Sequence, residues 1–131
     1  MIDRFGSGGP WEQTYGYSRL VRAGDLLLTA GCTATVDGVV TGVGDAYAQT
    51  ITAFRIAVDA LAAAGATIQD VMRTRMYVVR AADADTVGRA HGELFGAVRP
   101  VSTLVVVAGL LHPDHLVEVE AEAFVAAGVG P

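Results

Sequence analysis

The sequence predicts an α+β domain in which two helices cover one face of a mixed β-sheet. The chain has 131 residues, the usual length of one domain, so we expect residues 1–131 to form a single domain. Two segments repeat apolar residues at helical spacing. Five shorter segments are rich in β-branched and other apolar residues, which is typical of strands. Their order, two strands, helix, strand, helix and two strands, favours helices packed on a sheet.

The N-terminal part is expected to contain loops and a β-hairpin. The glycine-rich residues 6–10 are typical of a loop. Residues 17–21 and 26–30 are predicted strands, and turn-forming residues at 24–25 join them into a hairpin. An Asp-Gly pair at 37–38, flanked by valines, indicates a second turn.

The clearest helix is predicted over residues 45–64. Its apolar side chains advance by four and three residues and form one stripe: Tyr47, Ile51, Phe54, Val58 and Leu61. Asp45 suits the positive N-terminal end of the helix dipole. Gly65 is placed to end the helix, because glycine readily adopts the left-handed conformation found there.

A second helix is expected to begin around Asp83 and Asp85. Its apolar face would carry Val87, His91 and Leu94. Arg99 precedes a proline, and that position disfavours helical conformation, so the helix should end before it.

Three further strands are predicted over residues 71–79, 101–108 and 116–125. The strand at 101–108 is largely apolar on both sides, so we expect both of its faces to be buried. Two helices cover only one face of the sheet, and the chain has no third layer to cover the other. The sequence therefore predicts a homo-oligomer in which sheets from several subunits pack together.

Composition disfavours several classes of protein. The nine cationic side chains are all arginine, against fourteen acidic ones, and the net charge is −5. A general nucleic-acid-binding surface is therefore not expected. The sequence has no run of about eighteen apolar residues, so a membrane-spanning helix is not expected. No signal peptide is visible. Cys32 is the single cysteine, which excludes an internal disulfide. We expect a cytoplasmic protein with neither nucleic-acid nor membrane partners, from a GC-rich bacterial genome.

Short segments between about residue 11 and residue 125 follow one another in an order and spacing known from a protein family. They are residues 16–19, 24–25, 30–31, 48–50, 64–66, 70–71, 75–78, 95, 99–100 and 117–121. Together they resemble the Rid family of reactive intermediate imine/enamine deaminases, also called the RidA or YjgF family. Each segment alone has little specificity, and the collinear set carries the resemblance.

The resemblance implies a chorismate-mutase-like fold that assembles as a homotrimer. Three sheets would form a central barrel with the helices outside, and clefts would lie between subunits. Active family members hydrolyse imines and enamines, such as those released by pyridoxal-phosphate enzymes, to keto acids and ammonia, and they use neither a metal ion nor a cofactor. We therefore expect a small-molecule ligand and no cofactor here.

The resemblance also implies where the site lies, and it implies a departure from the family. An arginine that binds the substrate carboxylate stands two residues after the strand's proline in the family, and here that place is taken by Ser102. Gly88 likewise replaces a family asparagine. The chain therefore resembles a branch that lacks the substrate-binding arginine, and hydrolysis of 2-imino acids is not expected.

The remaining pocket residues of the family are matched by Tyr17, Gly31 and Glu120. We expect Glu120 to be catalytic, because a carboxylate in an apolar interface can act as acid or base. Tyr17, Gly31, Ser102 and Thr103 are the expected substrate-binding residues, and no metal ligands are predicted.

Each of these residues also has an ordinary structural interpretation. Strand alternation places Glu118, Glu120 and Glu122 on one side, where a solvated strand face would explain all three. Ser102 has no evident base beside it in the sequence, so a nucleophilic serine is not expected. A non-catalytic ligand-binding or scaffold protein remains the alternative function.

Several other residues are ambiguous from sequence alone. Trp11 and Glu12 lie in a predicted loop at 11–16 and would either cover a pocket or anchor the terminal segment. His91 is expected to be a buried, hydrogen-bonded histidine. Arg73 and Arg75 share a strand face, where surface ion pairs are the expected role.

Overall fold

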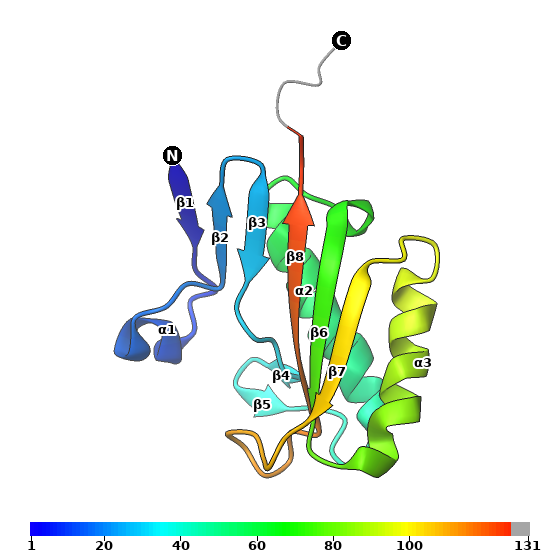
Figure 1. Cartoon of the computed structure of the whole chain (residues 1–131). Coiled ribbons are helices and arrows are strands. Elements are labelled where there is room, and N and C mark those ends of the chain that lie inside the picture. Colours follow the sequence, from blue (N-terminus) through cyan, green and yellow to red (C-terminus); the bar gives the residue numbers. More distant parts are fainter. Residues whose placement is uncertain (127–131) are drawn as a thin grey trace.

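The computed structural model describes residues 1–126, in which a six-stranded mixed sheet carries two long helices on one face (Figure 1). Residues 127–131 of the predicted domain lie outside the described residues. The strands of this sheet are β1 (Ile2–Phe5), β2 (Leu20–Ala23), β3 (Leu26–Thr29), β6 (Val71–Val78), β7 (Val101–Val106) and β8 (Val117–Phe124). The predicted α+β class, with both long helices on the same face, is confirmed.

The strand order is β1-β2-β3-β8-β6-β7, so the last strand within residues 1–126 lies in the middle of the sheet. β8 is antiparallel to both of its neighbours, β3 and β6. β6 and β7 are parallel, and the helix α3 (Ala84–Phe95) connects them. This single parallel pair makes the sheet mixed and leaves β7 at its edge.

The helix α2 (Ala46–Ala63) begins and ends as predicted. The carboxylate of Asp45 accepts a hydrogen bond from the Ala48 N–H, and Gly65 follows the helix with φ +93°. The predicted apolar stripe is partly wrong, because Tyr47 is 41% exposed and its hydroxyl donates to Glu93 on α3. Phe54 and Leu61 of that stripe are buried, together with Gln49. The rest of the buried face carries small side chains, which let the helix approach the sheet closely: Ala46, Thr50, Ala53 and Ala57.

The helix α3 also lies where the sequence predicts it. Val87 and Phe95 are buried beneath it, and His91 packs edge-on against Phe54 of α2. Arg99 lies beyond the helix end and adopts φ +59°, so the chain leaves helical geometry before Pro100 as expected.

The N-terminal segment is more regular than predicted. β1 is an unpredicted strand that pairs with β2, and residues 10–15 form the helix α1 (Pro10–Tyr15) in place of the expected loop at 11–16. Pro10 stands at its first turn and Gly16 ends it with φ +74°, which are ordinary signals for a helix start and end. Strand β2 begins at Leu20, three residues later than expected.

The predicted turn at 37–38 is present. It joins β4 (Thr35–Val36) and β5 (Val39–Val40) into a small separate hairpin, and Asp37 and Gly38 both have positive φ. The hairpin lies beyond one end of the main sheet (Figure 1).

The two faces of the sheet differ in character. Alternate β8 residues, from Val117 to Ala123, are buried on the helix-bearing face. The intervening glutamates lie on the other face, which carries no helix and which we call the open face. Edge strand β7 is exposed in a single chain, with Val101 at 59% and Val106 at 54%. The sequence predicts that both faces of this strand are buried in an oligomer. In a single chain neither face of β7 is fully covered.

Candidate functional site

A shallow pocket of about 270 Å³ lies on the open face, where β6 and β8 meet the loop after β7. Its lining combines acidic, phenolic and apolar groups: Gly31, Tyr77, Val107, Gly109, Leu110, Glu118 and Glu120. The pocket thus contains two of the five predicted site residues, Gly31 and Glu120.

Glu118 lies closely against the backbone of Gly31. A Cβ atom at residue 31 would overlap the Glu118 carboxylate, so this arrangement requires glycine there. Burial raises the pKa of Glu118 above its ordinary value, and the neighbouring Glu120 raises it further, against a smaller opposing effect from Arg19. Glu118 therefore holds a proton more readily than a solvated glutamate.

Glu120 has a different environment two residues along the same strand. The Tyr77 hydroxyl donates a hydrogen bond to Glu120 Oε1, and Arg75 Nη1 lies 4.0 Å from the same oxygen. This hydrogen bond, together with burial and the charge of Glu120, raises the pKa of Tyr77, which therefore remains a donor. The pocket consequently contains two carboxyl groups in unequal surroundings.

The third glutamate of β8 is paired outside the pocket. Arg75 Nη1 donates to Glu122 Oε1 at 2.8 Å, and Arg73 Nε lies 3.8 Å from Glu122 Oε2. The expectation that Arg73 and Arg75 form surface ion pairs is confirmed. Their positive charge lies mainly beside Glu122.

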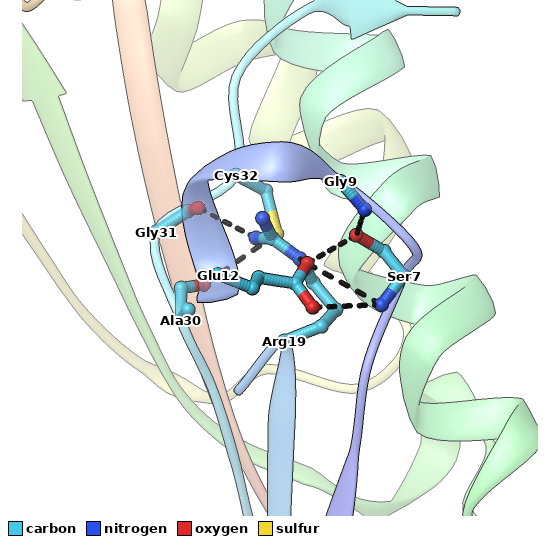
Figure 2. Close-up of polar contacts among 7 residues, drawn as sticks. All are labelled: Ser7, Gly9, Glu12, Arg19, Ala30, Gly31 and Cys32. Atoms are coloured by element: carbon cyan, nitrogen blue, oxygen red, sulfur yellow. Dashed lines mark hydrogen bonds and ion pairs between the residues drawn. The ribbon is translucent and has the colours of Figure 1, made fainter. Parts of the chain in front are cut away.

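Arg19 connects the N-terminal segment to the pocket wall (Figure 2). Its Nη1 donates to the Gly31 carbonyl oxygen at 2.7 Å and lies 3.3 Å from Cys32 Sγ, while Nε is 4.0 Å from a Glu12 carboxylate oxygen. Glu12 in turn accepts hydrogen bonds from the backbone and the hydroxyl of Ser7. Figure 2 shows these groups converging beneath α1, so Glu12 anchors the terminal segment.

The same contacts explain the acidity of Glu12. Burial by itself would raise its pKa, but the hydrogen bonds from Ser7 and the charge of Arg19 outweigh burial, and the pKa is lowered. Trp11, which precedes it, is 60% exposed and stacks on Tyr15 with ring centroids 5.7 Å apart. Neither residue lines the pocket.

The other predicted site residues lie elsewhere in a single chain. Tyr17 follows α1, is 41% exposed and does not line the pocket. Thr103 pairs with Arg75 on the open face, and strand β6 separates it from Glu120. Ser102 faces the opposite side of the sheet, toward α3, so one chain does not bring Ser102 and Glu120 together.

Ser102 belongs to a hydrogen-bonded chain on the helix-bearing side. The hydroxyl of the fully buried Thr74 donates to Ser102 Oγ at 2.8 Å and lies 2.7 Å from His91 Nε2. His91 also stacks on Phe95 with ring centroids 4.7 Å apart, and burial lowers its pKa. The expected hydrogen bond of His91 is confirmed, but the residue is half-buried rather than buried.

Sequence reasoning missed Glu118 and Tyr77 as pocket residues. Alternation alone is compatible with a solvated strand face for Glu118, and its contact with Gly31 depends on which strands pair. Tyr77 shares the open face with Arg73 and Arg75, but its bond to Glu120 depends on the register of β6 against β8.

Cys32, next to Gly31, is a buried small residue. Burial raises the pKa of its thiol despite the nearby Arg19, which does not favour a reactive thiolate. Within residues 1–126, no group of three or more His, Cys, Asp or Glu side chains could hold a metal ion. None of the described helices combines the length and the hydropathy needed to cross a bilayer.

The sequence is similar to a known protein family over most of its length. Residues 11–125 match the family model described as Endoribonuclease L-PSP. An uncharacterized Streptomyces coelicolor protein is 48% identical over 123 residues, which cover 94% of this chain and 92% of that protein.

Solved structures are similar over nearly the whole chain. A Mycobacterium tuberculosis member of the YjgF/YER057c/UK114 family is 42% identical, with a TM-score of 0.86 over 95% of this chain and 100% of that one. A Yersinia pestis protein of the Rid family, 21% identical, has the same fold, with a TM-score of 0.82 over 95% of this chain and 100% of that one.

Proposed function

This chain belongs to the Endoribonuclease L-PSP family, which includes the YjgF and Rid proteins, and we propose that it hydrolyses imines or enamines of small molecules. The reaction would take place at the open-face pocket, which contains Glu118, Glu120 and Tyr77. It requires neither a metal ion nor a cofactor.

The observation that carries this proposal is the unequal environment of the two pocket carboxyl groups. Glu118 is desolvated against Gly31, and its raised pKa favours the protonated form. Glu120 has different neighbours: its Oε1 accepts a hydrogen bond from the Tyr77 hydroxyl and lies 4.0 Å from Arg75 Nη1. Paired carboxyl groups in different surroundings can divide the roles of acid and base.

The two groups can carry the proton transfers of imine hydrolysis. Glu120 takes a proton from water as the water oxygen bonds to the imine carbon, and Glu118 gives a proton to the nitrogen. In the second half, the protonated Glu120 returns its proton to the departing nitrogen as the C–N bond breaks. Glu118 recovers a proton from the new hydroxyl group, so the products are a carbonyl compound and ammonia.

The charges around the pocket disfavour 2-imino acids as substrates. Arg75 donates to Glu122 and Arg19 donates to the Gly31 carbonyl, so the cations nearest the pocket already have partners. A substrate carboxylate would meet Glu118 and Glu120 without a counter-charge. Imines without an adjacent carboxylate are therefore the proposed substrates.

We also propose that the working unit is a homotrimer with clefts between subunits. Ser102 and Glu120 face opposite sides of one sheet, so a site that contains both needs two copies of the chain. The open face and edge strand β7 also expose apolar side chains that a partner would cover, among them Val101, Val105, Leu28 and Phe124.

Ligand binding without catalysis is the alternative function, because the family arginine is absent here. RNA cleavage, to which the name of the family model refers, is not favoured. The pocket is acidic and the chain carries a net charge of −5, which repels a phosphate backbone.

The test measures ammonia release from imines generated in situ, with and without a carboxylate beside the imine carbon. The wild-type protein should accelerate hydrolysis of the carboxylate-free imines over buffer. Glu120→Gln should lower the rate about 100-fold or more, because it removes the group that takes the proton from water.

Glu122→Gln is the matched control, since Glu122 lies on the same face of β8 but outside the pocket. Its activity should stay within about threefold of wild type. Wild-type protein that accelerates none of these imines would favour the ligand-binding alternative. Unchanged turnover in Glu120→Gln would exclude the catalytic role assigned to it.

A further inference from the structure

We propose that His91 and Thr74 position the Ser102 hydroxyl as an outward hydrogen-bond donor, which selects ligands with an uncharged acceptor oxygen such as an amide carbonyl. The inference rests on the proposed function in one respect, namely that Ser102 is part of the ligand site. His91 and Thr74 are positioning residues, because they act through Ser102.

The geometry of the chain sets the direction of its hydrogen bonds. A threonine hydroxyl carries one hydrogen, and that of Thr74 is donated to Ser102 Oγ at 2.8 Å. The bond between Thr74 Oγ1 and His91 Nε2, at 2.7 Å, must therefore be donated by the histidine. Hydrogen bonds thus run from His91 through Thr74 to Ser102.

This direction determines what Ser102 can do. The Ser102 oxygen accepts the hydrogen bond from Thr74. The hydroxyl hydrogen of Ser102 takes no part in the hydrogen bonds that link His91, Thr74 and Ser102. Ser102 is exposed on edge strand β7, so that hydrogen can be donated to a ligand. Donors in a connected chain polarise one another, which strengthens the outermost one.

The supporting residues are held rigidly. Thr74 is fully buried, and the His91 ring is fixed between Phe54 and Phe95, with centroid distances of 5.5 and 4.7 Å. Burial also lowers the pKa of His91, so the ring is neutral at physiological pH. The chain is thus preorganised without a formal charge.

An uncharged donor and an arginine select different ligands. The guanidinium group matches a carboxylate in charge and in geometry, whereas a hydroxyl leaves the carboxylate uncompensated. A carbonyl oxygen needs only one donor. There is also space next to these hydrogen-bonded residues. Gly88 lies one helical turn before His91, and no atom lies within 4 Å of the position that a Cβ atom would take there.

The experiment compares two probes of equal size, pyruvamide and pyruvate, in protein-observed NMR titrations. Wild-type protein should bind pyruvamide about three- to tenfold more tightly, which is the range expected for one neutral hydrogen bond. Ser102→Ala and Thr74→Val should remove this preference, while Thr74→Ser, which restores the hydroxyl, should retain it. Ser102→Arg should reverse it in favour of pyruvate.

A second measurement tests the chain without a ligand. The ¹⁵N shifts of His91 should show the hydrogen on Nε2 in the wild-type protein. A hydrogen on Nδ1, equal or tighter binding of pyruvate by wild type, or no binding of either probe would overturn the inference. A preference that survives Thr74→Val would overturn it as well.

Failure of the proposed function is distinguishable from failure of this inference. A pyruvamide preference that depends on Thr74, in a protein that hydrolyses no imine, would overturn the hydrolase proposal alone. Imine hydrolysis without such a preference would overturn the donor chain alone.

Discussion

The carboxylate of Glu118 occupies the space that a side chain on residue 31 would need. Glu118 is thereby held against a backbone segment whose carbonyl oxygen accepts a hydrogen bond from Arg19. The position of the Glu118 carboxyl group thus depends on having glycine, which lacks a Cβ atom, at residue 31 in the loop after β3.

Replacing Gly31 with alanine should therefore displace the Glu118 carboxyl group. Because that group is the end of a flexible side chain, the protein should be destabilised by only about 1 kcal/mol, the low end of the usual cost of overpacking. Thermal or urea unfolding would measure the loss. Gly31→Ala combined with Glu118→Ala should recover most of it, because the overlapping group is gone. Gly88→Ala, where the added methyl meets nothing, should be neutral or slightly stabilising. Equal stability of Gly31→Ala and wild type would contradict the contact.

Glu118→Gln should stabilise the protein at neutral pH and not at acid pH. The folded-state pKa of Glu118 lies above its ordinary value of 4.5, so on raising the pH the unfolded chain releases this proton first. Wild-type stability should therefore decline as pH rises from about 4.5 through the folded-state pKa. Glutamine does not titrate, so the Glu118→Gln variant does not lose stability in this way. The melting temperature of the variant should exceed that of the wild-type protein by a few degrees at pH 7. A difference that does not shrink toward pH 4 would refute this explanation.

Arg19→Ala should loosen the N-terminal segment. It removes a charged donor from the Gly31 carbonyl and a cation from beside Glu12, at a cost of about 1.5–3 kcal/mol. Limited digestion with a protease that cleaves after aromatic residues should then cut sooner at Trp11 or Tyr15. Arg89→Ala is the control, because its ion pair with Asp85 is exposed and should contribute little to stability. Equal cleavage of both variants would contradict the anchoring role.

Val105→Asp should disrupt assembly. Val105 lies on the open face of the edge strand and is 41% exposed in one chain, so a partner would have to bury the new charge. Light scattering should show a three-chain mass for wild type and a smaller mass, or unfolding, for the variant. Val39→Asp, on a 63% exposed residue of the β4–β5 hairpin, should keep the wild-type mass. A stable single-chain wild-type protein would exclude the proposed trimer.

Local signals explain which parts of the fold could be predicted. Asp45 and Gly65 mark the ends of α2 through contacts within a few residues of themselves, so the sequence was sufficient. The buried face of α2 was predicted less well, because hydropathy favours Tyr47 over the alanines. The sheet instead selects small side chains there, and Ala53 and Ala57 are fully buried.

The pocket could be predicted only in part, because it depends on strand register. An irregularity between Val71 and Arg73 shifts the pairing of β6 with β8, and beyond it Arg75 lies opposite Glu120. The bond from Tyr77 to Glu120 follows from that register. Local sequence carries no signal for it, since a shift of one residue would turn Tyr77 to the other face.

The central place of β8 has a consequence for biosynthesis. β8 lies between β3 and β6, yet it is the last strand of the sheet to be translated. The hairpin of β2 and β3 and the parallel pair of β6 and β7 therefore cannot join until the ribosome has released residue 124. Messages truncated before β8 would yield chains with two unpaired strand edges, which are templates for aggregation. Cellular quality control would thus meet such chains with the two parts of the sheet not yet joined.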